Sequence, residues 1–266
     1  MIPTAPIDPD APVLFWREAG VAHVRFNRPA ALNAIDVALG QAFHEACRVL
    51  AADDSVRVVV LSGQGRAFMA GGDLASMQAD PIGGSAALIA QMHPAIEILA
   101  SLRAPVIASV HGAVAGGGLG LALACDLIIA AQGTRFTLAY PRIGTSSDCS
   151  TSWGLVRWVG LRKALEIALL NETIDADEAQ RIHLINRVVP VESLATETAQ
   201  IADRIAQSAP IALGHLKQLM RQSDHNDLRT QLELEAKLFR ECAGTADFAE
   251  GLASFLGKRE ARFQGR

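Results

Sequence analysis

The stretch VAGGGLGLA at Val114–Ala122 constrains the fold of this chain more than any other. Three consecutive glycines and a fourth follow directly on the apolar run PVIASVHG at 105–112. Glycine inside regular structure costs about 1 kcal/mol relative to alanine. The chain therefore needs residues without a side chain here, either for close packing or to let a ligand approach the main chain.

Apolar runs alternate with helical patterns along the first two thirds of the chain. VRVVVLSG at 56–63, PVIASVHG at 105–112 and CDLIIAA at 125–131 predict strands buried on both faces. Asp36 is a suitable N-cap for a helix that follows it, and a second helix is predicted over 85–102. Together with a hairpin over 12–26, this alternation predicts an α/β fold with parallel pairing.

The strand signal fades after about residue 155, and residues 193–266 carry helical patterns only. We therefore predict a core over 1–194 and a helical C-terminal region over 195–266. The segment DPIGGS at 80–85 predicts a mobile loop, because glycine and proline dominate it.

Composition excludes several classes of function. The 266 residues carry a formal net charge of −4, which gives no basic face for nucleic acid. Neither a signal peptide nor a membrane-spanning segment is expected. The four cysteines are widely spaced, which predicts free thiols and a cytoplasmic protein, and the histidines show no metal-site spacing.

Two interpretations of the glycine run compete beside plain close packing. A phosphate cradle lacks its sequence patterns here, since there is no GxxxxGK[ST] and no strand–GxGxxG–helix spacing. An oxyanion hole needs backbone N–H groups aimed at developing negative charge. The segment AFMAGGDL at 67–74 is a second glycine loop after a buried strand. Two such loops can each direct one N–H group at the same oxygen.

Several spaced motifs resemble those of the crotonase superfamily, the enoyl-CoA hydratase/isomerase family. They are RPAALNAI, GRAFMAGGDL, PVIASVHGAVAGGGLGLALACDLIIA and the terminal DFAEGLASFLGKREARF. The resemblance implies a spiral of ββα units with a C-terminal helical region that forms trimers, often dimers of trimers. It implies acyl-CoA thioester substrates, with no other cofactor, and oxyanion donors at the backbone N–H groups of Gly72 and Gly117.

The chain departs from the hydratases of that family at two positions. They use two glutamates to add water, and the matching positions here are Gly120 and Tyr140. Water addition needs one group to activate the water and another to deliver a proton. The resemblance therefore predicts an enzyme that is not a true hydratase.

Asp148, in RIGTSSDCSTSW, is the remaining candidate for acid–base or nucleophilic chemistry. Local sequence also permits a helix N-cap at this position. By resemblance to the family's isomerases Asp148 is a proton shuttle, and Tyr140 is able to donate a hydrogen bond to it. By resemblance to the 4-chlorobenzoyl-CoA dehalogenases Asp148 is a nucleophile and His93 is the base, although those enzymes carry tryptophan where this chain has Tyr140. A third alternative is an enoyl-CoA hydratase in name only or a non-catalytic acyl-CoA-binding paralogue.

The resemblance also implies where coenzyme A binds, as part of the substrate. The implied contacts are the loop with Ala31, Leu32 and Ala34, and backbone groups near Ala70 and Gly72. Two basic residues, Arg28 and Lys258, would contact CoA phosphate, and Lys258 would do so on a neighbouring subunit. For both basic residues a solvated surface role competes with phosphate binding. The expected partners are an acyl-CoA substrate and further copies of the chain, as a homotrimer or homohexamer.

Overall fold

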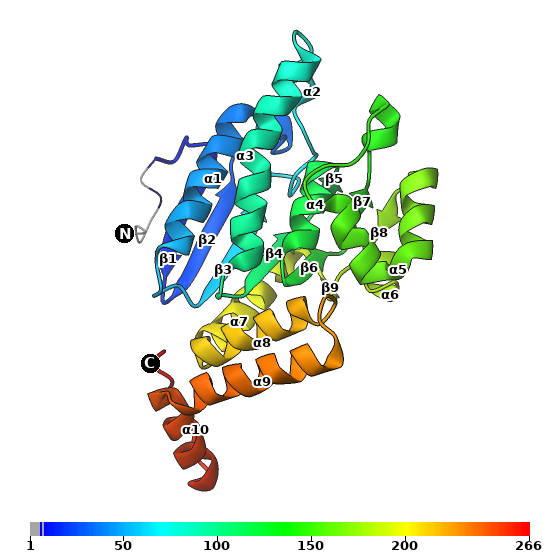
Figure 1. Ribbon diagram of the computed structural model, residues 1–266. Coiled ribbons are helices and arrows are strands. Elements are labelled where there is room, and N and C mark those ends of the chain that lie inside the picture. The colour runs from blue at the N-terminus through cyan, green and yellow to red at the C-terminus, as the bar shows by residue number, and fades with distance from the viewer. Residues whose placement is uncertain (1–5, 7) are drawn as a thin grey trace.

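A six-stranded, mostly parallel sheet forms the centre of the molecule (Figure 1). The computed structural model describes residue 6 and residues 8–266. The strands in spatial order are β1 (Val13–Glu18), β2 (Val21–Phe26), β3 (Val58–Gly63), β4 (Val106–Val110), β6 (Leu127–Ala131) and β9 (Arg187–Val189). Among the strand pairs of this sheet that the structure describes, β1–β2 alone is antiparallel, and this hairpin has its turn at Ala19 and Gly20. The predicted α/β class with parallel pairing is confirmed.

A second, three-stranded sheet lies beside the first. Its strands are β5 (Ala113–Ala115), β7 (Arg135–Thr137) and β8 (Ile174–Asp175). Strands β5 and β7 are parallel, whereas β7 and β8 are antiparallel. The sequence predicted none of the strands β5, β7, β8 and β9, because each has at most three residues. Strand β9 also occupies the stretch RVVP that we interpreted as a boundary.

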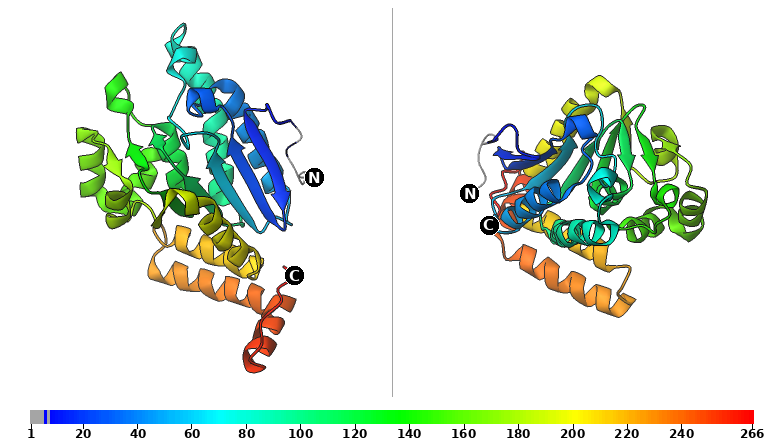
Figure 2. Two further views of the ribbon diagram at one scale, coloured as in Figure 1. Left: turned by 180° about the vertical axis from the view of Figure 1, so that it is seen from behind. Right: turned by 90° about the horizontal axis from the view of Figure 1, so that it is seen from above.

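The helices and 3-10 turns connect and cover these sheets. They are η1 (Pro29–Ala31), α1 (Val37–Ala51), α2 (Leu74–Met77), α3 (Pro81–Ser101), α4 (Gly117–Ala124), η2 (Tyr140–Ile143), α5 (Thr151–Leu170), α6 (Ala176–Arg181), η3 (Val191–Ser193), α7 (Leu194–Ala206), α8 (Pro210–Gln222), α9 (Leu228–Ala243) and α10 (Ala246–Leu256). Helices α1 and α3 cover the face of the large sheet that is turned toward the viewer in Figure 1. Helix α7 covers the opposite face, which the left view of Figure 2 shows.

Strand β3 shows why the central runs are continuously apolar. Val59 and Leu61 pack into the larger core cluster, to which α1 and α3 contribute, and Val58 and Val60 pack into a second cluster with α7. All four side chains are buried, as expected for a strand covered on both faces. Helix α7 therefore packs directly on the sheet. Helices α8, α9 and α10 extend away from it (Figure 1). The division at residue 194 stays a prediction.

Two local predictions need correction, and one is confirmed. The segment at 80–85 is the start of α3, because the Asp80 carboxylate caps the Gly83 N–H group at 2.9 Å and Pro81 occupies the first helical position. Asp148 is not the N-cap of α5, which begins at Thr151 after Ser150. Asp36 does cap α1, accepting from the Leu39 N–H group at 2.8 Å.

Candidate active site

Two glycine loops meet where strands β3 and β4 end. Met69 N–H donates to the Ala113 carbonyl at 3.1 Å, and Ala115 N–H donates back to the Met69 carbonyl at 3.0 Å. Farther along, a Cβ atom on Gly71 would lie 3.6 Å from the Gly116 Cα atom. The two main chains therefore run side by side, and both need glycine at the contact, where φ is +106° at Gly71 and +52° at Gly116.

Gly72 and Gly117 are the residues that follow this contact on the two loops. Gly117 is the first residue of α4, so its N–H group has no acceptor inside the helix. Within the described chain, neither the Gly72 nor the Gly117 N–H group donates a hydrogen bond. Gly72 is half-buried, and Met77 packs beside it. Two free donors on adjacent loops are what an oxyanion hole requires.

Asn33 joins the expected CoA loop to the first glycine loop. Its side chain is fully buried, and its amide donates to the carbonyls of Gln64 at 2.9 Å and Ala67 at 2.8 Å. Its amide oxygen accepts the Arg28 N–H group at 2.8 Å. The motif RPAALNAI contains this residue, but our sequence analysis gave it no role. Its burial, which only the structure shows, reveals this role, because a buried amide needs partners.

The position of the first hydratase glutamate leaves no room for a side chain. Gly120 is buried on α4, and a Cβ atom there would overlap the Cys149 carbonyl oxygen and the Thr151 hydroxyl oxygen. The turn over residues 148–151 therefore fills the space that a carboxylate at position 120 would need. The same turn brings Cys149 close to Gly117, since a Cβ atom on Gly117 would lie 3.2 Å from the Cys149 sulfur.

Asp148 is half-buried in this turn and is held by Tyr140. The Tyr140 hydroxyl donates to Asp148 Oδ1, as predicted, and the Asp148 carbonyl accepts from the Thr151 N–H group at 3.0 Å. Burial, and next the negative charge of Asp148, raises the pKa of Tyr140 above its ordinary value of 10.0. Tyr140 therefore keeps its proton and remains a donor to the carboxylate.

His93 on α3 reaches the same turn. The Cys149 N–H group donates to His93 Nε2 at 3.4 Å, so in this arrangement the Nε2 lone pair is an acceptor and Nδ1 carries the proton. The imidazole is otherwise exposed. The structure therefore brings His93 beside Asp148, with its basic nitrogen already occupied. Burial also raises the pKa of the Cys149 thiol, which makes it a poor nucleophile.

The predicted CoA-binding residues divide into two groups. Leu32 lies next to Ala70, whose N–H group donates to the Leu32 carbonyl at 3.1 Å, so the loop with Ala31 and Ala34 adjoins the Gly72 loop. The Arg28 guanidinium forms ion pairs with Asp36 and Asp73, both at 3.0 Å. Arg28 therefore ties these loops together, and its predicted phosphate contact competes with two carboxylates.

Lys258 lies apart from the other predicted site residues. It follows α10, which extends away from the sheet and its glycine loops (Figure 1). Its predicted contact with CoA requires a second copy of the chain. Within the described residues no cluster of three or more metal-ligating side chains occurs, and no helix is long and apolar enough to cross a membrane.

An apolar pocket of about 250 Å³ lies between η2 and α5, and Tyr140 is one of its lining residues. Leu138 and Leu155 contribute to its apolar lining, and its polar lining residues include Thr145, Ser146, Ser147 and Ser152. Such a lining suits an uncharged ligand group.

Comparison with known proteins decides the family. The sequence profile described as enoyl-CoA hydratase/isomerase matches residues 16–266. The chain belongs to this family. It is 36% identical over 258 residues to the 1,2-epoxyphenylacetyl-CoA isomerase of Escherichia coli, covering 96% of this chain and 98% of that one. It is 35% identical over 246 residues to 4-chlorobenzoyl coenzyme A dehalogenase-2 of an Arthrobacter species, covering 90% and 88%.

A solved structure supports the same assignment. The enoyl-CoA hydratase of Bacillus anthracis superposes with a TM-score of 0.92 at 29% identity, covering 96% of this chain and all of that one. The crotonase-type fold expected from the motifs is therefore confirmed. The chain is an acyl-CoA enzyme of the enoyl-CoA hydratase/isomerase family, whose members carry isomerase, hydratase and dehalogenase names.

Proposed function

We propose that this family member moves a proton between two carbons of an acyl-CoA thioester, as an isomerase does. The observation that carries the proposal is a pair of glycine amides without acceptors in the described chain, one of which adjoins the turn that carries a carboxylate held by Tyr140. The amides belong to Gly72 and Gly117, and the carboxylate to Asp148.

The amides act on the thioester carbonyl. Its oxygen accepts both N–H groups, and negative charge collects on that oxygen when a proton leaves the neighbouring carbon. Donors already aimed at this charge need no reorganisation, and each is typically worth about 3 kcal/mol in the transition state. The positive end of the α4 dipole at Gly117 adds to this stabilisation.

Asp148 carries the proton. Its carboxylate accepts the α-proton, which gives an enolate, and returns that proton to the γ-carbon, so that the double bond moves into conjugation. One carboxylate suffices for a transfer that begins and ends on carbon, whereas adding water needs two groups. Tyr140 holds the carboxylate, and His93 holds the turn through the Cys149 N–H group.

The substrate and assembly follow from the surroundings. The loop with Ala31, Leu32 and Ala34, together with Ala70, would hold coenzyme A, which enters as part of the substrate. The pocket that Tyr140 helps to line suits an apolar acyl group.

We further propose a homotrimer or homohexamer, because α9 and α10 expose large apolar side chains, such as Phe255 with 82% of its surface exposed. Lys258 would then meet the CoA of a neighbouring subunit.

Conversion of trans-3-hexenoyl-CoA to the 2-enoyl isomer, followed by the ultraviolet absorbance of the conjugated product, tests the proposal. Asp148→Asn should lower kcat by about 10²- to 10⁴-fold, the range typical of general acid–base catalysis. Asp177→Asn, which removes an exposed carboxylate on α6, is the matched control and should leave the rate unchanged. Equal rates for both variants would refute the role of Asp148 as proton carrier, and no conversion by the unsubstituted protein would instead support a non-catalytic acyl-CoA-binding protein.

A second candidate is dehalogenase-like chemistry on an aryl-CoA. The approach of His93 to the Asp148 turn favours it, as does the similarity to the Arthrobacter dehalogenase. Asp148 would attack the ring carbon and displace chloride, and water activated by His93 would hydrolyse the resulting ester. Before it could accept a proton from water, His93 Nε2 would have to release the Cys149 N–H group.

One turnover in ¹⁸O-labelled water separates the two candidates. Hydrolysis of an aspartyl ester at its carbonyl leaves one labelled oxygen in Asp148, and mass spectrometry of the peptide that contains it detects the label. With 4-chlorobenzoyl-CoA the isomerase proposal predicts no chloride release and no label.

A further inference from the structure

Helix α4 is poorly suited to hold its own position. It has only eight residues, and three of them are glycines: Gly117, Gly118 and Gly120. Glycine is a poor helix former, and isolated helices of this length are unstable in water. All eight residues are buried, so the ends of the helix must find partners inside the protein. The Gly117 amide can only be aimed accurately if other elements fix this helix.

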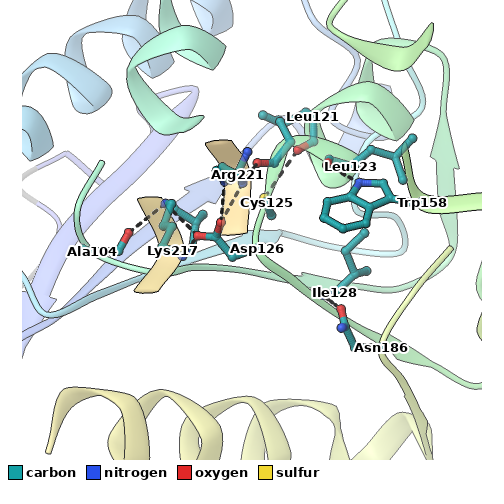
Figure 3. A network of polar contacts seen from close by, with 12 residues as sticks. Ala104, Leu121, Leu123, Cys125, Asp126, Ile128, Trp158, Asn186, Lys217 and Arg221 are labelled. Atoms are coloured by element: carbon teal, nitrogen blue, oxygen red, sulfur yellow. Dashed lines mark hydrogen bonds and ion pairs between the residues drawn. The ribbon is translucent and has the colours of Figure 1, made fainter. Parts of the chain in front are cut away.

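The C-terminal carbonyls of α4 receive donors from two other helices and from the residue that follows α4 (Figure 3). Trp158 of α5 donates its indole N–H to the Leu123 carbonyl at 3.0 Å, and Arg221 of α8 donates to the Ala124 carbonyl at 2.9 Å. The residue after the helix, Cys125, provides the other two donors, from its thiol and its N–H group. All four terminal acceptors are thus satisfied, two of them by distant side chains.

Arg221 is itself held firmly. It donates from Nε and Nη2 to Asp126 Oδ1 at 3.1 and 2.6 Å. Asp126 Oδ2 forms an ion pair with Lys217 at 2.7 Å and accepts the Val106 N–H group at 2.8 Å (Figure 3). The network therefore joins α8 to the first residue of β4 and to Asp126, which immediately precedes β6. These contacts give Asp126 a structural role.

We propose that Arg221, with Trp158, is a positioning residue for the oxyanion amide. Both act through α4, which extends about 12 Å from its capped end to Gly117. Fixing the last two carbonyls sets the axis of the helix, and the axis sets the direction of the Gly117 N–H group. A cation at the C-terminal end also suits the helix dipole. This inference rests on the proposed function of Gly117, and it gives α8, which lies in the C-terminal helical region, a part in the reaction.

Infrared spectroscopy of a bound thioester tests this role. Butyryl-CoA with ¹³C at the thioester carbonyl is bound to the full-length protein, and the carbonyl stretch reports how strongly the amides polarise it. The variants are Arg221→Met, which keeps the aliphatic stem without donors, and Trp158→Phe, which keeps a ring without the N–H group. Arg229→Met is the control, since Arg229 is an exposed residue on α9.

In the unsubstituted protein the carbonyl stretch should move to lower frequency on binding. Arg221→Met should lose at least half of this shift, and its isomerase kcat should fall at least tenfold with KM changed less than threefold. A merely structural residue would lower the amount of folded enzyme without changing the shift.

Three results have distinct meanings. A full shift and an unchanged kcat in Arg221→Met would overturn the positioning role while leaving the oxyanion proposal intact. No shift in the unsubstituted protein would overturn the oxyanion proposal and, with it, this inference. If Arg221→Met does not fold, Trp158→Phe decides in the same way.

Discussion

Replacing Gly120 by alanine tests the arrangement of the candidate site directly. The added Cβ atom would overlap the Cys149 carbonyl oxygen and the Thr151 hydroxyl oxygen. Because the Cys149 oxygen belongs to the backbone, rotating a side chain does not relieve the overlap. The turn over residues 148–151 must move away from α4, and Asp148 must move with it.

The expected loss in the free energy of unfolding follows from the size of this overlap. Overpacking a well-packed interior by a methyl group costs about 1–3 kcal/mol, and an overlap with backbone belongs at the upper end. In a chain of this length each kcal/mol lowers Tm by about 2–4 °C, so we expect a fall of about 6–12 °C. A displacement of about 1 Å at Asp148 is expected to lower kcat by about 10²-fold.

Calorimetry and the isomerase assay measure the two effects. Gly244→Ala is the matched control, because Gly244 has φ −80° and a Cβ atom there would meet its nearest neighbour at 3.6 Å. This control should change the free energy of unfolding by less than about 0.5 kcal/mol. If Gly120→Ala is as stable and as active as Gly244→Ala, the turn does not occupy the space beside α4. By the same reasoning Gly120→Glu should create no hydratase activity.

Three further outcomes are expected. Asn33→Leu leaves buried carbonyls without donors, and we expect the free energy of unfolding in urea to fall by about 3 kcal/mol or more; a loss below about 1 kcal/mol would contradict the role of Asn33 as a link between loops. Burial, and next the charge of Arg25, lowers the pKa of His23 from 6.5, so the unfolded chain binds the proton more readily. Stability should therefore fall as the pH drops below about 6.5, and His23→Gln should remove this part of the dependence; equal pH profiles would refute it. Phe239→Asp on α9, where 65% of the phenylalanine is exposed, should shift the sedimentation profile toward monomers, and an unchanged profile would place the contact elsewhere.

The sequence predicted those parts of the fold that depend on local pattern. The continuous run VVVL of β3 is buried on both faces because α1 and α3 cover one side and α7 the other. The Asp36 cap follows from local chemistry alone. The segment at 80–85 was predicted wrongly, since the Asp80 cap and Pro81 outweigh two glycines that are unfavourable in a helix.

The candidate site was predictable only in part. The donation from Tyr140 to Asp148 spans eight residues, and the family resemblance together with the hydroxyl of Tyr140 predicts it. The hydrogen bond between the Cys149 N–H group and His93 spans 56 residues. The tautomer of the His93 imidazole depends on how α3 packs against the turn. The contact of Arg221 with the Ala124 carbonyl spans 97 residues. No local periodicity encodes such contacts, because they arise only when distant elements fold together.

The central claim is that two main-chain amides on separate loops bind one carbonyl oxygen. A crystal structure with an acyl-CoA analogue in which CH₂ replaces the thioester sulfur tests it most directly, because the ketone keeps the oxygen and does not hydrolyse. We predict that this oxygen lies within about 3.2 Å of both the Gly72 and the Gly117 nitrogen atoms. An oxygen bound by only one of these amides, or by neither, would contradict the account.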